Sequence, residues 1–157
     1  EVKLGPVHLP PCVWSVEQLD MTQRGDTVFG GQMKLLGYRL DGAARPGDTV
    51  YLTLFWQGLG KMDKDYTIFV HLLDAQGNLC GQQDNQPVNG FYPTGSWQAG
   101  EIVRDPYSLS LPAVCPPGNY TLRVGVYDAS SGERLPAAGS STATSGDSMS
   151  ISLTAQP

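Results

Sequence analysis

The chain has 157 residues, enough for one domain with its own core, and its 19 Gly and 12 Pro with only 16% charged residues favour short strands over long helices. A net charge of −5 without a Lys/Arg cluster excludes nucleic acid as a partner. No segment approaches the roughly 20 apolar residues that cross a bilayer, so we expect no membrane insertion by this chain.

The first part of the chain, residues 1–26, contains three prolines and a polar stretch. We expect an irregular lead-in that packs on a single domain formed by residues 27–157. Because the chain begins at Glu1 rather than Met, we expect it to be a piece of a longer polypeptide. The run "VFGGQMKLLGYRL", residues 28–40, predicts one strand kinked at its two glycines.

Two strongly apolar runs follow, at residues 48–58 and 65–74. In the first, Val50, Leu52, Leu54 and Trp56 alternate with more polar residues and predict one core-facing side. The second, "DYTIFVHLLD", is apolar on both faces, which is typical of an interior strand. The segment "DAQGN" then predicts a hairpin turn with Gly77 at positive φ, and residues 79–85 predict the returning strand.

Residues 85–100 have no period and carry Phe91, Tyr92 and Trp97, so we expect a loop that either packs on the domain or presents a binding surface. Further strands are predicted at 101–111, where Pro106 indicates an edge or a bulge, and at 119–128 and 148–155. Seven to nine strands at about ten-residue spacing predict an all-β fold, an antiparallel β-sandwich that is immunoglobulin-like or jelly-roll-like.

The three cysteines permit one disulfide and one free thiol. Cys12 and Cys115 both lie in Pro-rich, loop-like segments, whereas Cys80 lies in a predicted strand. We therefore favour a Cys12–Cys115 bridge, although spacing does not establish the connectivity. A bridge would imply an oxidising, extracytoplasmic location.

Catalytic signatures such as GxSxG, HExxH and a phosphate-binding glycine loop are absent. His71 could act as a base with Asp74 or Asp84, but Asp74 lies three residues along the strand and faces the other way. We interpret His71 as a half-buried histidine bonded to a neighbouring strand or loop, and we predict no catalytic residue. No metal ligand pattern or cofactor motif is present; a structural Ca²⁺ at "DAQGN" and Asp84 is a weaker alternative, because the spacing is not that of a calcium loop.

A carbohydrate surface needs aromatic rings for sugar faces and polar side chains for hydroxyls. The strand faces opposite the predicted core supply Tyr51, Phe55, Phe69, His71, Arg123 and Tyr127, and the aromatic loop adds Phe91, Tyr92 and Trp97. Of these, we select Phe69, His71, Tyr92, Trp97, Arg123 and Tyr127 as candidate glycan-binding residues. The alternative is that the aromatic residues form a second half of the core, covered by residues 1–26 and the loop.

The motifs "LLGYRL", "RPGDTVYLTLFWQ", "DYTIFVHLLDAQGNLCGQQDNQP", "YPTGSWQAGEIVRDPYSLSLP" and "GNYTLRVGVYDASSGERL" occur in this order across residues 29–136. This series resembles the extracytoplasmic C-terminal β-sandwich domain of bacterial multi-spanning membrane glycosyltransferases similar to protein mannosyltransferases. The resemblance implies a non-catalytic accessory domain at the extracytoplasmic face of the cell membrane, with the transmembrane part of the parent protein as a partner. It carries over no catalytic residue.

Three classes of function follow. We favour an accessory domain of a glycosyltransferase-like membrane protein that binds a glycan. A purely structural or protein-interaction module is the alternative. An independent glycan hydrolase is the third class, and it would need paired carboxylates or an activated histidine that the sequence does not show.

Overall fold

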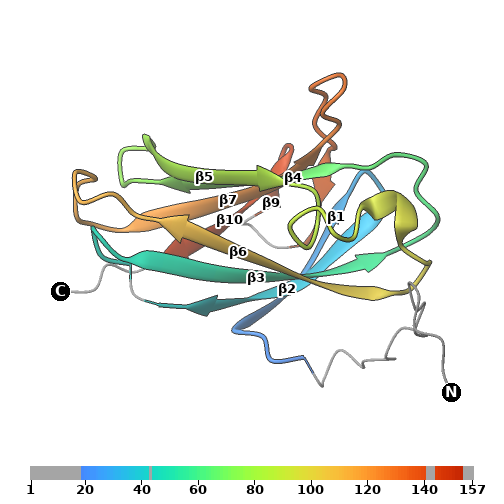
Figure 1. Ribbon diagram of the computed structural model, residues 1–157, viewed down its shortest axis with the longest axis horizontal. Coiled ribbons are helices and arrows are strands. Elements are labelled where there is room, and N and C mark those ends of the chain that lie inside the picture. The colour runs from blue at the N-terminus through green and yellow to red at the C-terminus, as the bar shows by residue number, and fades with distance from the viewer. Residues whose placement is uncertain (1–18, 43, 141–143, 154–157) are drawn as a thin grey trace, which may run out of the picture.

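Two antiparallel sheets of five strands each face one another in the computed structural model (Figure 1). The structure describes residues 19–42, 44–140 and 144–153. The first sheet has the order β6-β3-β2-β1-β8 and the second the order β5-β4-β7-β10-β9. The strands are β1 (Gln23–Phe29), β2 (Met33–Asp41), β3 (Thr49–Gly58), β4 (Thr67–Leu73), β5 (Leu79–Asn85), β6 (Ile102–Ser110), β7 (Tyr120–Tyr127), β8 (Ala137–Ala138), β9 (Thr144–Ser145) and β10 (Ser148–Leu153).

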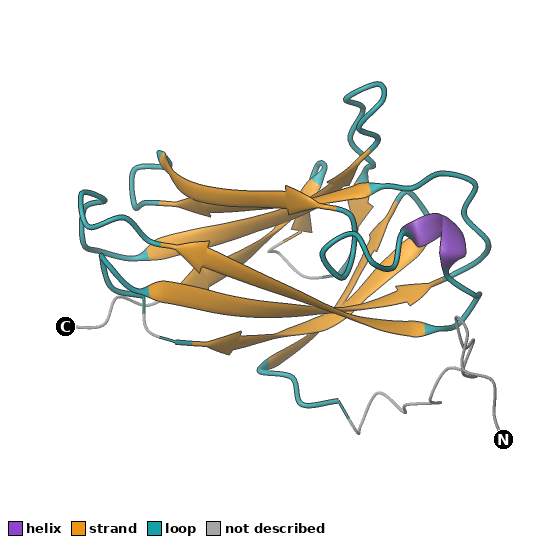
Figure 2. Ribbon diagram, viewed as in Figure 1, coloured by secondary structure: helices purple, strands orange, loops and turns teal. Residues whose placement is uncertain are grey.

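The predicted antiparallel β-sandwich is confirmed. Two strands of two residues each, β8 and β9, bring the number to ten, beyond the predicted seven to nine. In the described part of the chain the single helical element is one 3-10 turn, Thr94–Ser96, in the loop that leads from β5 to β6 (Figure 2). No helix among these residues is long and apolar enough to span a membrane.

Alternating side chains from both sheets fill one apolar core. As predicted, Val50, Leu52, Leu54 and Trp56 of β3 point inward and are buried. The Trp56 indole meets the Phe29 ring edge to face, with the ring centroids 5.6 Å apart. From the second sheet, β4 and β7 contribute Ile68, Val70, Leu72, Leu122, Val124 and Val126, all fully buried.

The start of the domain differs from the prediction. Residues 28–40 form a hairpin of β1 and β2 rather than one kinked strand, because Gly30 and Gly31 adopt φ values of 59° and 67° and reverse the chain. Residues 23–26, which we assigned to the irregular lead-in, belong to β1. Residues 1–18 of that lead-in lie outside the described residues, so the division at residue 27 stays a prediction.

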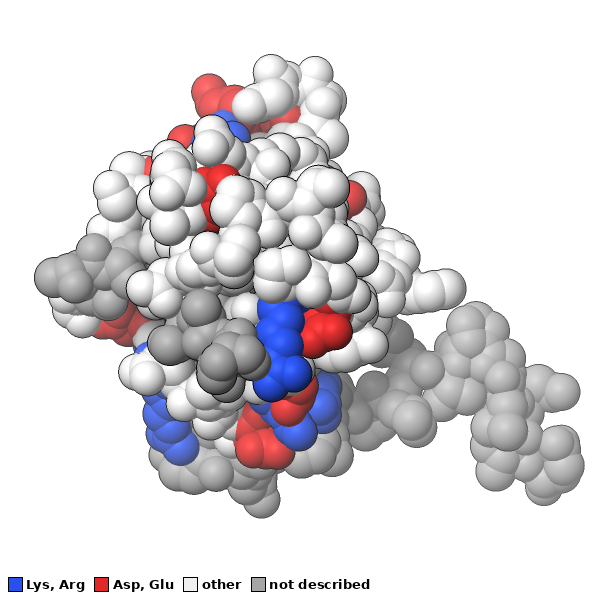
Figure 3. All heavy atoms as spheres, turned by 90° about the vertical axis from the view of Figure 1, so that its left-hand side faces the viewer, with Lys and Arg blue, Asp and Glu red and all other residues white. Residues whose placement is uncertain are grey.

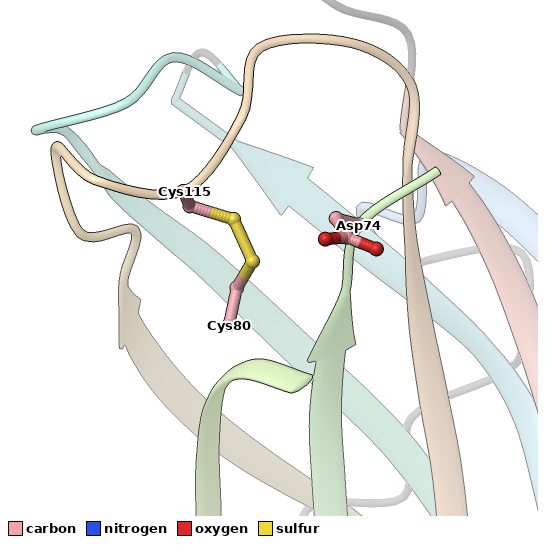
Figure 4. Close-up of side chains that lie close together, drawn as sticks. All are labelled: Asp74, Cys80 and Cys115. Atoms are coloured by element: carbon pink, nitrogen blue, oxygen red, sulfur yellow. A yellow bond between two sulfur atoms is a disulfide. The ribbon is translucent and has the colours of Figure 1, made fainter. Parts of the chain in front are cut away.

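A disulfide joins Cys80 of β5 to Cys115 in the loop between β6 and β7, with the two Cα atoms 6.0 Å apart (Figure 4). The predicted pairing of Cys115 with Cys12 is therefore wrong; Cys12 lies outside the described residues. The β5 strand is the edge of the second sheet, and the Cys115 loop crosses from the first sheet to the second. The disulfide thus joins the edge strand of one sheet to the loop that connects the two sheets. The local sequence around each cysteine does not show that these two segments lie close together.

A buried carboxylate fastens the loop after β5 to the first sheet. Asp105 of β6 is fully buried and accepts hydrogen bonds from Trp56 Nε1 (3.1 Å), the Tyr107 hydroxyl (2.7 Å) and the Val88 backbone N–H (2.8 Å). The last bond helps to hold Val88 at φ 57°, a backbone conformation that β-branched residues rarely adopt. Burial raises the pKa of Asp105 to about 6, against the hydrogen bonds that lower it.

Loss of the disulfide should destabilise the domain by about 4 kcal/mol, because the bond closes a loop of 35 residues' separation in the unfolded chain. We expect this difference in the free energy of unfolding when wild type is compared with a variant carrying both Cys80→Ser and Cys115→Ser. Denaturant unfolding with and without reductant provides the control: reductant should weaken the wild type and leave the double variant unchanged. Peptide mapping that found a Cys12–Cys115 link would contradict the assignment.

The raised pKa of Asp105 predicts a pH dependence of stability. The folded state binds this proton more tightly than the unfolded state, whose carboxyl titrates near pH 4. The resulting stabilisation is present below about pH 4 and is lost as the pH rises through about 6, a loss of up to about 3 kcal/mol. Denaturant unfolding at several pH values should show a smaller loss in Asp105→Asn than in wild type; equal slopes for the two proteins would sink the prediction.

Candidate functional site

Most of the candidate glycan-binding residues selected from the sequence lie on the outer face of the second sheet. Because Val70 and Leu72 of β4 point into the core, the alternate residues Phe69 and His71 point outward. Phe69 lies between Asp84 of β5 and Gly125 of β7. His71 lies between Gln82 and Arg123, and Arg123 in turn lies beside Ser150 of β10. We call this surface the β4–β7 face and define it by Phe69, His71, Gln82, Asp84, Arg123, Tyr127, Arg134 and Ser150.

Phe69 forms the floor of the β4–β7 face. Its ring lies across Gly125, where a Cβ would come within 2.2 Å of ring carbons Cε2 and Cζ. The Arg134 guanidinium stands over the ring at 4.4 Å from its centroid, and the His71 ring lies 4.7 Å from it. Only 1% of Phe69 is exposed. The prediction that Phe69 itself contacts a ligand is therefore wrong for this arrangement, because other side chains cover the ring.

Asp84 collects hydrogen bonds at one side of the face. The Tyr127 hydroxyl donates to Asp84 Oδ2 at 3.2 Å, and Gln82 Nε2 donates to Oδ1 at 3.3 Å. His71 Nε2 lies 3.9 Å from Asp84 Oδ1, too far for a hydrogen bond. Burial lowers the pKa of His71, Asp84 opposes that effect, and the nearby Arg134 and Arg123 reinforce it. The neutral imidazole is thus the dominant form at neutral pH.

The sequence interpretation of His71 holds in part. The side chain is half-buried, and it approaches a carboxylate on a neighbouring strand. Asp74, the other partner considered, faces away and is engaged in the β4–β5 turn, where its Oδ1 accepts from the backbone N–H groups of Gln76 and Asn78. This is an ordinary turn role for aspartate.

The two arginines of the β4–β7 face differ in their surroundings. Arg134 stacks on Phe69 and lies 3.4 Å from an oxygen of Asp147. Arg123 is exposed, and its guanidinium has no hydrogen-bond or ion-pair partner among residues 19–42, 44–140 and 144–153. On the first sheet Arg39 pairs with Asp20 and Asp41, and basic and acidic side chains adjoin one another on the end of the molecule seen in Figure 3.

Tyr92 and Trp97 lie in the loop from β5 to β6, at the end of the sandwich. The Trp97 side chain is completely buried in the core, and its Nε1 donates to the Tyr92 carbonyl at 2.9 Å. A sugar platform at Trp97 is therefore excluded. The Tyr92 hydroxyl donates to the Glu101 carboxylate at 2.7 Å, and burial together with that carboxylate raises the pKa of Tyr92 to about 12.

The six strand residues predicted on one face belong to two surfaces. Tyr51 and Phe55 lie on β3 in the first sheet, whereas Phe69, His71, Arg123 and Tyr127 lie on β4 and β7 in the second. Tyr51 is 53% exposed, but Phe55 is buried, with the Arg104 guanidinium 5.8 Å from its ring centroid. Alternation along a strand gives the inward or outward direction; it does not tell which sheet the strand joins.

One group of three metal-ligating side chains occurs in the described part of the chain: Asp74, Cys80 and Cys115 (Figure 4). Both cysteine sulfurs are consumed by the disulfide, which leaves Asp74 alone. Asp84, the other oxygen donor considered for Ca²⁺, lies on the β4–β7 face with Tyr127 and Gln82. These contacts therefore assemble no calcium ligand set.

Comparison with known proteins establishes the class of fold. The chain matches no known family and no curated protein sequence. Among solved structures it is similar to the C-terminal domain of Wzt, with a TM-score of 0.56 and 12% identity over 92% of this chain and 90% of that one. It is also similar to a β-glucuronidase from glycoside hydrolase family 2, with a TM-score of 0.52 and 10% identity over 77% of this chain. The matched region spans only 11% of the glucuronidase, so the likeness concerns one domain of that enzyme and its fold alone.

Gly125→Ala should disrupt the floor of the β4–β7 face, because the added methyl would collide with the Phe69 ring. We expect a loss of roughly 1–3 kcal/mol in the free energy of unfolding and altered NMR shifts of Phe69 and His71. Gly60→Ala is the matched control, since nothing lies within 4 Å of a Cβ at that position. If Gly125→Ala matched Gly60→Ala in stability and spectra, the proposed contact would be refuted.

Proposed function

We propose that the domain is a non-catalytic module that binds a carbohydrate on the β4–β7 face. The observation that carries the proposal is the row Gln82, His71, Arg123 and Ser150, which crosses four adjacent strands with Asp84 and Tyr127 beside it. At about 4.8 Å per strand spacing this row extends over roughly 14 Å. It presents amide, imidazole, guanidinium, hydroxyl and carboxylate groups, the chemistry that binds sugar hydroxyls.

Several features support binding over catalysis. His71 and Asp84 are 3.9 Å apart, and no hydroxyl or thiol of the described residues is hydrogen-bonded to the imidazole. Nucleophilic catalysis needs such a contact between nucleophile and base. The similarity to one domain of a glycoside hydrolase, at 11% of its length, and to the separate C-terminal domain of Wzt supports an accessory role.

We further propose that the domain belongs to a bacterial membrane protein resembling a glycosyltransferase and lies on the extracytoplasmic side. Two observations support this location. The first is the ordered series of motifs across residues 29–136 that resembles the C-terminal domain of such proteins. The second is the Cys80–Cys115 disulfide, since disulfides persist in oxidising compartments. The transmembrane part of the parent protein would then be a physical partner.

A protein-interaction module is the second candidate function. It is favoured by Phe91, which is 86% exposed in the loop that Asp105 holds through Val88. An exposed aromatic ring on a fixed loop can serve as an anchor for a protein partner. This candidate predicts binding to a protein with no affinity for glycans.

A glycan array followed by calorimetric titration tests the proposed function. We expect wild type to bind at least one class of glycan, and His71→Ala and Asp84→Ala each to weaken that binding about tenfold, the loss of one or two hydrogen bonds. Tyr51→Ala, which removes an exposed ring from the first sheet, is the control and should bind like wild type. Failure to bind any glycan, or equal losses in the control, would count against the proposal.

A further inference from the structure

Arg123 stands out among the charged side chains of the β4–β7 face. It lies in the middle of β7, with His71 on one side and Ser150 on the other, and it is exposed. Because β7 is paired with β4 on one side and β10 on the other, the backbone of Arg123 is fixed and the position of its side chain is restrained. Within the described ranges that guanidinium has no acidic partner.

The acidic groups near this face are already occupied. Asp84 accepts from Tyr127 and Gln82, and it lies on β5, two strand spacings or about 10 Å from the β7 strand that carries Arg123. Asp147 is paired with Arg134. The row through His71 is therefore positive at its β7 side, although the whole chain carries a net charge of −5.

We propose that Arg123 makes the β4–β7 face selective for acidic glycans, its guanidinium binding the carboxylate of a uronic acid unit. A planar guanidinium matches a carboxylate with two parallel hydrogen bonds. Because Arg123 has no ion-pair partner among the residues that the structure describes, binding breaks no ion pair within that part of the chain. The hydroxyls of the same or the adjoining sugar unit would bind to His71 and to the donor and acceptor positions of Gln82 and Asp84 that their mutual hydrogen bond leaves unused. This inference rests on the proposed glycan binding.

A carboxylate bound at Arg123 should also change the protonation of His71. The charged groups that act on the imidazole are Asp84 from β5, Arg123 from β7 and Arg134 from the segment after β7. A carboxylate bound at Arg123 adds a negative charge beside His71 and favours its protonated form. Binding of an acidic glycan should therefore tighten as the pH is lowered, whereas binding of an uncharged ester should show no such change.

The experiment compares trisaccharides of galacturonic, glucuronic and mannuronic acid with their methyl esters, which keep the sugar skeleton and remove the charge. In titration calorimetry at low salt, wild type should bind at least one free acid ten times or more tightly than its ester. Arg123→Ala should reduce that ratio to threefold or less, and Arg123→Lys should retain part of it. Arg104→Ala removes the same charge from the first sheet and serves as the matched control.

The outcomes separate this inference from the proposed function. Equal affinity of wild type for acid and ester, with neutral glycans bound on an array, would overturn the acidic preference and leave glycan binding in place. An acidic preference that survives Arg123→Ala would overturn the role of Arg123. Binding of no acid, ester or neutral glycan would overturn both proposals. A preference lost in Arg123→Ala, retained in Arg104→Ala and stronger at lower pH would support the inference.

Discussion

The arrangement of the β4–β7 face depends on the burial of one side of β4. Ile68, Val70 and Leu72 are fully buried between the two sheets. Since side chains alternate along a strand, a slip of one residue would expose these three and bury the histidine between them. The core therefore fixes the direction of His71, and pairing with β5 and β7 then fixes its neighbours.

Phe69 would make the outer side of β4 apolar if its ring were not covered. Glycine within a strand often marks a place where another group approaches closely, and Gly125 accepts the Phe69 ring across it. The Arg134 guanidinium then covers the Phe69 ring, and an antiparallel β-bridge between Arg134 and Tyr127 holds the arginine in this position. An aromatic ring that could have been an exposed patch thus becomes the support of a polar surface.

Local pattern predicted the local features and missed the distant ones. The inward faces of β3 and β4, the turn at Gly77 and the edge position of Pro106 on β6 all follow from alternation and turn chemistry. The burial of Trp97 depends on how the loop after β5 folds over the end of the core, and the Cys80–Cys115 pairing depends on a crossover between sheets. Both require knowing which segments meet across the sandwich, and alternation holds no such information.

The position of Asp84 on an edge strand raises the question of how that strand is held. Cys80 fixes the start of β5 through the disulfide, and Gln83 Oε1 in its middle accepts from the Ser108 N–H of β6 at 2.9 Å. Beyond its end, Val88 is bound by the buried Asp105 carboxylate. An edge strand is otherwise a weakly restrained part of a sheet. Restraint at two points on β5 and at a third just beyond its end keeps Asp84 and Gln82 in place beside His71 before any ligand arrives, which lowers the entropic cost of binding.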